Sequence, residues 1–214
     1  MDKEVNFYFA RLNKLNDFNL LSIYSFHKLG YTCVMWCYEE IINLPEYVIV
    51  KDANEIIPYN GNTYVAFLSD EFRMLLLNKY GGLYSDLDNI ILKSLPETEY
   101  ILAGRHSNTI NSIIRTPINS ELTNYLVDNR EIINNNVKLH QKIVDFNLDK
   151  WVIPVRDINY FNGDLTEIAD KEIDWSKVES YMVHLFQSMH RACYRRKDVY
   201  NLNIANLKKF VEEQ

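Results

Sequence analysis

Residues 79–88 read Lys79-Tyr80-Gly81-Gly82-Leu83-Tyr84-Ser85-Asp86-Leu87-Asp88. They follow a predicted long helix over residues 62–80, which Gly81 ends because glycine takes up the left-handed backbone conformation at little cost. The glycine pair permits a tight turn into a predicted strand over residues 83–85, which leads directly into Asp86 and Asp88. This order of elements indicates an α/β fold with two carboxylates at a strand end.

The rest of the chain alternates predicted strands and helices. We expect strands at residues 5–10, 31–38, 47–50, 100–103, 151–155 and 180–185. We expect helices at residues 17–28, capped by Asp17 and ended by Gly30, at 120–129 and 131–146, and from residue 203 onward. Such alternation predicts a mainly parallel mixed sheet flanked by helices, with ligands bound at the carboxyl ends of its strands.

Composition narrows the class of protein. The 214 residues fit one domain, residues 1–214, which is either a whole protein or the N-terminal part of a longer one. A net charge of −6 argues against a nucleic-acid partner bound through a broad positive field. We expect no membrane span, because no long apolar run is present, and a cytoplasmic location, because no secretory signal is visible.

Asp86 and Asp88 are candidate metal ligands. Hard divalent cations such as Mn²⁺ or Mg²⁺ take one or two carboxylates and keep positions open for substrate phosphates. Asp70 and Arg73 lie about 60° apart on the preceding helix. Either they form a structural ion pair, or both point at a substrate; the residues alone leave both interpretations open.

One pattern combines these features: Ala66, Ser69-Asp70, Arg73, Leu76, Gly81-Gly82, Tyr84 and Asp86-x-Asp88. It resembles the DXD-motif sugar-transferase family, which includes fungal mannosyltransferases and the glucosylating domains of clostridial toxins. A fainter resemblance is to the N-terminal glycosyltransferase domains of chlorella-virus capsid-glycosylation proteins, which would place a virus-encoded enzyme in host cytoplasm. The family resemblance implies a single GT-A-like domain and a metal-dependent, retaining glycosyltransferase of the hexosyltransferase type.

The resemblance also implies partners and roles. The donor would be a UDP-sugar and the acceptor a glycan or glycoprotein, with Mn²⁺ or Mg²⁺ as cofactor. Asp86, Asp88, Asp70 and Arg73 would form the catalytic set, and Asp70, Arg73 and Asp86 would also contact the donor. Phe7 and Tyr8 would lie beside the nucleoside, with a core position as the preferred interpretation for any single ring of that strand.

The C-terminal part supplies three more candidates by the same resemblance. His184 would be a third metal ligand beside Asp86 and Asp88, with a structural strand histidine as the alternative. His190 and Arg191 would hold the donor diphosphate, with a solvated basic face as the alternative. The family often has Ser-Trp after such a histidine, and this tryptophan is absent here.

Two other functions fit the acidic pair. A phosphohydrolase would use Asp86-x-Asp88 as nucleophile and acid, but Gly81 to Ser85 is a poor match for the apolar strand that such enzymes place before the pair. A non-catalytic module would bind sugar nucleotides or glycans without transfer. Binding of UDP and metal with neither transfer nor donor hydrolysis would identify this second function.

Overall fold

The computed structural model describes residues 3–10, 13–59, 65–105, 108–133, 135–159, 168–169, 171–185 and 197–214. Its main element is a seven-stranded sheet in the order β3-β2-β1-β4-β7-β6-β8. The strands are β1 (Glu4–Phe9), β2 (Thr32–Cys37), β3 (Ile49–Asp52), β4 (Gly82–Ser85), β6 (Ile101–Arg105), β7 (Asn108–Thr116) and β8 (Val152–Pro154). Strand β7 runs antiparallel to β4 and β6, whereas the other neighbouring pairs are parallel. The expected mainly parallel mixed sheet is confirmed.

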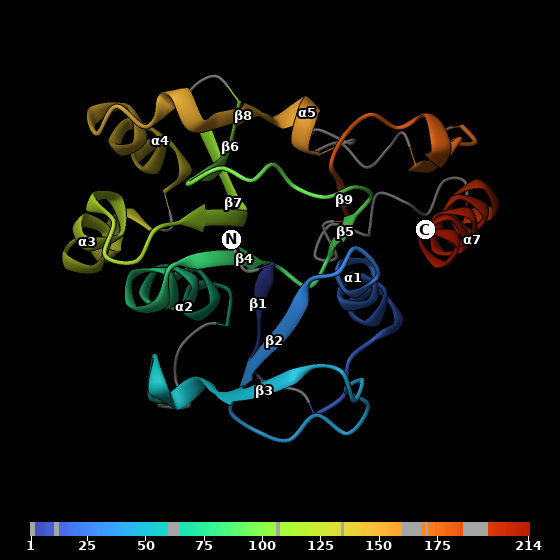
Figure 1. Ribbon diagram of the computed structural model, residues 1–214, viewed down its shortest axis with the longest axis horizontal. Helices are drawn as coiled ribbons and strands as arrows, with labels where there is room; N and C mark the ends of the chain where they lie inside the picture. The colour runs from blue at the N-terminus through green and yellow to red at the C-terminus, as the bar shows by residue number, and fades with distance from the viewer. Residues whose placement is uncertain are drawn as a thin grey trace.

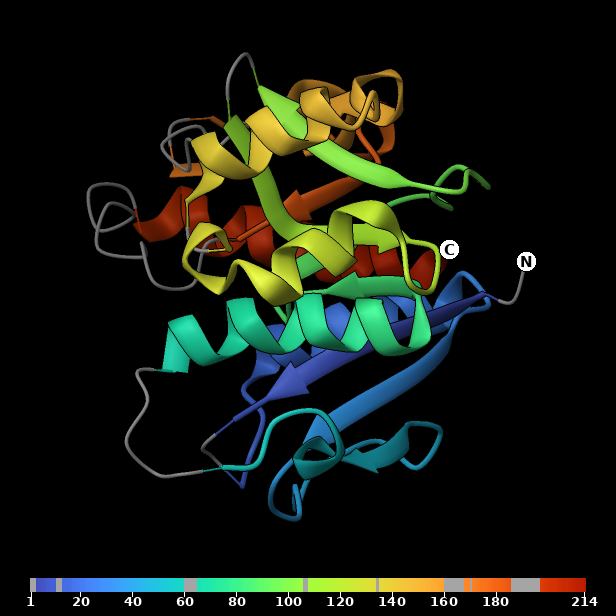
Figure 2. The same cartoon turned by 90° about the vertical axis from the view of Figure 1, so that its left-hand side faces the viewer.

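Helices cover both faces of this sheet (Figure 1). Helices α2 (Val65–Tyr80), α3 (Glu121–Asp128) and α4 (Asn136–Asp145) lie on one face, seen toward the viewer in Figure 2. Helix α1 (Asp17–Lys28) lies on the other face, with α7 (Lys197–Glu213) beside it, and a short helix α5 (Val155–Ile158) follows β8. Strand alternation divides the core between the faces, since Phe7 packs on the α1 side and Tyr8 on the α2 side.

A second, two-stranded sheet pairs β5 (Asn89–Ile91) with β9 (Met182–His184) in antiparallel register. Its apolar side chains pack with α1 and α7 in a separate cluster that includes Leu21, Ile90, Val183 and Leu207. This small sheet therefore joins the end of the acidic motif to the C-terminal part of the chain. Of the helices in the described ranges, none combines the length and the apolar character that crossing a membrane requires.

Several predicted boundaries differ from the structure. Asn16, not Asp17, caps α1 by accepting from the backbone of Phe18 and Asn19. Residues 45–48 form a turn, with Val48 N donating to Pro45 O over 3.0 Å, so β3 begins only at Ile49. The predicted helix 131–146 starts later, at Asn136, because the Asn135 side chain caps it.

Two strands and part of a helix were missed altogether. Strands β5 and β7 had no prediction, and α7 begins at Lys197, six residues before the predicted start at 203. Predicted helix residues 62–64 lie outside the described ranges.

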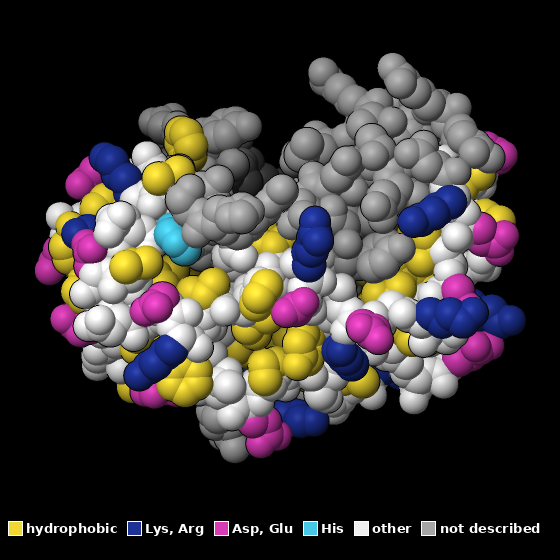
Figure 3. All heavy atoms as spheres, turned by 90° about the horizontal axis from the view of Figure 1, so that it is seen from above, with side chains coloured by type: hydrophobic (Ala, Val, Ile, Leu, Met, Phe, Trp, Pro, Cys, Tyr) yellow, Lys and Arg dark blue, Asp and Glu magenta, His cyan; other side chains and the backbone are white. Residues whose placement is uncertain are grey.

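Seen from the side of α4 and α5, the described surface carries acidic and basic side chains interspersed with hydrophobic ones (Figure 3).

Candidate functional site

A pocket of about 310 Å³ opens where β1 and β4 end and α2 begins. Its lining comes from four segments of chain that the fold brings together: Tyr8, Phe9, Asn19, Ser69, Asp70, Arg73, Asp86, Leu87 and Asp88. The pocket therefore lies at the carboxyl ends of parallel strands, the place where ligands bind in open α/β sheets.

The glycine turn sets the position of Asp86. Gly81 and Gly82 have φ values of +64° and +88°, in the left-handed region that glycine adopts at little cost. A Cβ on Gly81 would lie 2.5 Å from Ile118 N, so the turn also needs glycine for close backbone approach. From this turn β4 leads to Asp86, whose backbone N–H donates to Ser112 O of β7 over 2.7 Å.

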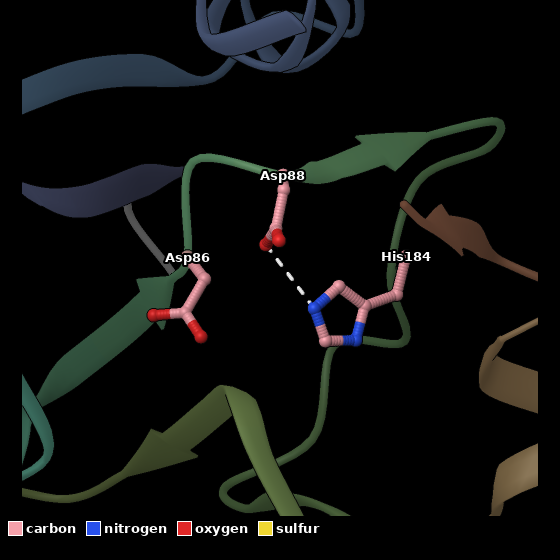
Figure 4. Close-up of side chains that lie close together, drawn as sticks. All are labelled: Asp86, Asp88 and His184. Atoms are coloured by element: carbon pink, nitrogen blue, oxygen red, sulfur yellow. Dashed lines mark ion pairs between the residues drawn. The ribbon is translucent and has the colours of Figure 1, made fainter. Parts of the chain in front are cut away.

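Asp86, Asp88 and His184 form a three-residue cluster (Figure 4). One ligand atom from each lies within 4.8 Å of the others. His184 Nε2 is 3.1 Å from Asp88 Oδ1, and the β5–β9 pairing places His184 opposite Asn89. Asn159 Oδ1 accepts the His184 backbone N–H over 3.0 Å, and Leu185 N donates to Asp88 O over 2.9 Å.

This cluster has the donor atoms that a divalent cation requires. Ligand atoms bound at about 2.1 Å to one ion are at most about 4.2 Å apart, so small side-chain rotations would bring the three onto one centre. Two carboxylates and an imidazole suit Mn²⁺ or Mg²⁺, the carboxylates favouring either ion and the imidazole favouring a transition metal.

Arg73 is buried and fully engaged by the protein. Its Nη2 lies 3.0 Å from Asp70 Oδ1 and 3.1 Å from Asp86 Oδ1, and Nη1 lies 3.3 Å from Asp86 Oδ2. The remaining donors reach the Ser69 carbonyl and hydroxyl, each at 3.3 Å, and the Asn111 carbonyl. All five N–H groups therefore have acceptors within the site.

Asp70 is hydrogen-bonded at one of its two carboxylate oxygens. Its Oδ1 accepts from Arg73 Nη2 and from Asn111 Nδ2, the latter over 3.1 Å. Its side chain is 22% exposed and lines the pocket. Asp70 and Arg73 therefore form an ion pair, and both residues also line the pocket.

Burial and neighbouring charges shift the pKa values in this group. Burial raises the pKa of Asp86 to about 6, with Asp88 adding to the effect and Arg73 opposing it. Burial also raises the pKa of Asp70, against Arg73 and Asn111. Burial alone lowers the pKa of Arg73, but Asp86, Tyr84 and Asp70 outweigh it, so the net direction is upward and the guanidinium stays charged.

The aromatic candidates on β1 lie in different environments. Tyr8 lines the pocket, with its ring stacked on Phe72 at 4.1 Å between centroids, and Phe9 lines it as well. Phe7 is fully buried on the opposite side of the sheet, with its ring edge-to-face with that of Phe26. The structure therefore places Tyr8 and Phe9 at the pocket and Phe7 in the core.

Sequence reasoning gave no role to three side chains of the site, and two of its candidates fall on residues that the structure does not describe. Tyr84 donates to Asp86 Oδ1 over 3.0 Å, Ser69 accepts from Arg73, and Asn111 contacts Asp70. Tyr84 and Ser69 stand within the motif, whereas Asn111 belongs to a strand that was not predicted. His190 and Arg191 lie outside the described residues.

Comparison with known proteins agrees with this geometry. Residues 18–116 match the family described as "Glycosyltransferase sugar-binding region containing DXD motif". The fold is similar to that of the PaToxG glycosyltransferase, with a TM-score of 0.51 at 16% identity over 97% of this chain and 86% of that one. It is also similar to the apo-form glycosyltransferase GlyE of Streptococcus pneumoniae TIGR4, with a TM-score of 0.51 at 12% identity over 100% of this chain and 63% of that one. No curated protein matches the sequence.

The matched region, residues 18–116, runs from α1 to the end of β7 and holds Asp70, Arg73, Asp86 and Asp88, while His184 comes from outside it. The resemblance expected from the motif is confirmed, as is the GT-A-like fold. Residues 18–116 therefore resemble the DXD-containing sugar-binding region of glycosyltransferases.

Proposed function

We propose that this chain is a metal-dependent glycosyltransferase that moves a sugar from a nucleoside-diphosphate donor, with a UDP-sugar favoured, to a glycan or protein acceptor with retention. The observation that carries the proposal is the cluster of Asp86, Asp88 and His184 at the edge of a pocket that Asp70 also lines. A metal site and a hydrogen-bonding carboxylate in one pocket suit a donor that has a diphosphate at one end and hydroxyl groups at the other.

Asp86, Asp88 and His184 would hold Mn²⁺ or Mg²⁺. The bound cation would neutralise the charge that develops on the departing diphosphate. In the described lining of the pocket three carboxylates face one arginine, whose donors are all engaged. These residues repel a free diphosphate, so the cation would supply much of the affinity for it. His190 and Arg191, which lie outside the described residues, remain the proposed diphosphate contacts.

The other pocket residues would contact the sugar and the nucleoside of the donor. Asp70 would accept hydrogen bonds from sugar hydroxyls, because its side chain reaches the pocket. Arg73 would act by holding Asp70 and Asp86 in place, since its N–H groups already have acceptors. Tyr8 and Phe9 would border the nucleoside, where an aromatic face supports a base.

Thermal unfolding tests the proposal. We expect a large rise in Tm with UDP and Mn²⁺ together and a small one with either alone. A ligand at about a hundred times its Kd adds about 2.7 kcal/mol of stability, which for this size is a shift of about 5–10 °C. The same series with GDP tests the choice of base.

Transfer is then measured with radiolabelled UDP-sugars. Donor hydrolysis or transfer that requires Mn²⁺ supports the enzyme. Tight binding of UDP and Mn²⁺ with neither reaction would show a binding module instead. Absence of any shift with UDP or GDP, at concentrations above millimolar, would overturn the proposed donor site.

A further inference from the structure

We infer that Asn111 is a positioning residue, which holds Asp70 so that this carboxylate accepts a hydrogen bond from a donor sugar hydroxyl. The inference rests on the proposed function and deepens it, because it assigns a specific residue of β7 to the sugar half of the donor. Asn111 lies outside the acidic motif and comes from a strand that the sequence did not reveal.

The contacts of Asn111 reach both partners of the ion pair. Its side-chain Nδ2 donates to Asp70 Oδ1 over 3.1 Å, and its backbone carbonyl accepts from Arg73 Nη1. Arg73 Nη2 lies 3.0 Å from the same Asp70 Oδ1. Two donors from different elements, α2 and β7, therefore fix one oxygen of Asp70.

The second oxygen is left for a ligand. Among the hydrogen bonds of the described residues, none reaches Asp70 Oδ2, and the side chain is 22% exposed in the lining of the pocket. A carboxylate oxygen offers more than one acceptor site and no donor, so it suits the hydroxyl of a sugar. Because Oδ1 is held from two sides, the direction of Oδ2 is set before the ligand arrives.

An irregularity in the sheet aims Asn111 at this position. Strand β7 pairs with β6 as Leu102 with Ile114 and then as Ala103 with Ile110, so residues 111–113 of β7 have no partner on β6. On the other side, pairing with β4 ends at Ser85 with Ile113. Bulges of this kind often lie next to active sites, where they redirect a side chain. Asn111 is the first residue of the bulge.

The alternative is that Asn111 only stabilises the fold. A residue that orients Asp70 affects the sugar and spares the nucleotide, whereas a structural residue changes both together. The decisive quantity is therefore the ratio of two affinities, measured in saturating Mn²⁺: that for the nucleotide sugar and that for its parent nucleotide.

The experiment uses the whole chain and titrates UDP and GDP, together with UDP-glucose, UDP-galactose, UDP-N-acetylglucosamine and GDP-mannose. For the sugar nucleotide that the wild type prefers, Asn111→Ala is expected to lower this ratio about tenfold while the affinity for the nucleotide alone changes less than about twofold. Asn111→Gln, which keeps an amide donor, is expected to recover part of the loss. Asn201→Ala, at an exposed position on α7, is the matched control and is expected to behave as wild type.

A double-variant cycle completes the test. If Asn111 acts through Asp70, Asp70→Asn combined with Asn111→Ala loses no more of the ratio than Asp70→Asn alone. Additive losses, or equal losses for the nucleotide and the nucleotide sugar, would overturn the inference while leaving the proposed function in place. A wild type that binds nucleotides but no nucleotide sugar more tightly than its nucleotide would overturn the inference too. A wild type that binds none of the six compounds would overturn both.

Discussion

Asp86 is shared between two tasks, because it contacts Arg73 and also belongs to the cluster with Asp88 and His184. Asp88 Oδ1 lies 3.1 Å from His184 Nε2, whereas the ion pairs of Arg73 are with Asp70 and Asp86. Loss of Asp88 therefore removes a ligand of the proposed cation, while the ion pairs of Arg73 with Asp70 and Asp86 remain. This asymmetry makes Asp88 the cleaner residue for testing the metal.

Asp88→Asn is expected to keep the fold and lose the stabilisation by Mn²⁺. An amide is a weaker ligand than a carboxylate for a hard cation, and loss of the charge weakens the attraction, so we expect at least tenfold weaker Mn²⁺ binding. Calorimetric titration with Mn²⁺ measures the affinity. Asp128→Asn, at an exposed position on α3, makes the same chemical change away from the pocket and should leave the affinity unaltered. Unchanged Mn²⁺ affinity in Asp88→Asn would refute the metal assignment.

The raised pKa of Asp86 makes the stability of the metal-free protein depend on pH. Its value of about 6 exceeds the ordinary 3.8, so the folded state binds the proton more tightly than the unfolded state. The resulting stability is fully present below about pH 4 and is lost as pH rises through 6, by about 3 kcal/mol in total. Mn²⁺ competes with this proton, so its affinity should rise over the same interval.

Comparison with Asp86→Asn isolates this contribution, because the variant cannot ionise at this position. Urea unfolding of both proteins without metal, between pH 4 and 7, gives the difference in unfolding free energy. We expect the stability of the wild type to fall relative to that of the variant as pH rises. A difference that is constant across this range would show that Asp86 titrates at its ordinary pKa.

At the scale of elements, the turn between α2 and β4 carries the motif into the pocket. Gly81 and Gly82 share the left-handed conformation, but only Gly81 approaches another backbone, at Ile118 N. Gly82 has no heavy atom within 4 Å of the place where a Cβ would stand. The two glycines therefore separate conformational strain from steric contact.

Gly81→Ala is expected to destabilise the protein more than Gly82→Ala. Both substitutions force an alanine into the left-handed region, at a cost of about 1–2 kcal/mol. Gly81→Ala adds a clash that only a backbone shift relieves, so we expect its total cost to exceed that of Gly82→Ala by about 1–3 kcal/mol. Chemical denaturation of the two variants gives the comparison. Equal costs would mean that the contact with Ile118 has no energetic consequence.

The sequence predicted correctly those helix and strand ends that depend on local residues. Gly81 predicted the end of α2, and the motif placed Asp86 and Asp88 at a strand end. Strand β7 escaped because Asn108, Asn111 and Ser112 are polar and its bulge interrupts the alternation of side chains, while its stability comes from pairing with both β4 and β6. Asn111 was hidden for the same reason, since contacts between distant segments leave no local pattern.

At the scale of the molecule, the described residues form three apolar clusters that support the pocket. Two occupy the opposite faces of the main sheet, and the third joins α1, α7 and the β5–β9 sheet that holds Asp88 and His184 in place. Sequence reasoning placed the start of α7 six residues late, and it had no means of foreseeing that this helix covers the small sheet. The C-terminal helix therefore contributes to the site indirectly, through the packing beneath β5 and β9.

Asn203 attaches α7 to the rest of the domain. It is fully buried, and its side chain donates to the carbonyls of Ile168 and Lys171 and accepts from Ile173 N; its backbone carbonyl accepts from Trp175 Nε1. Asn203→Ala leaves the backbone groups of Ile168, Lys171 and Ile173 without these partners, at about 1 kcal/mol each, so we expect a loss of about 3 kcal/mol and a Tm lower by about 6–12 °C.

Because the clusters share α1 and the sheet, we expect this loss to appear as one cooperative transition and not as separate melting of α7. Thermal unfolding followed by far-ultraviolet circular dichroism and by tryptophan fluorescence should give coincident midpoints in the variant. Asn201→Ala, at an exposed position on the same helix, should stay within about 0.5 kcal/mol of wild type. Two separated transitions would show that α7 and the small sheet unfold independently of the main sheet.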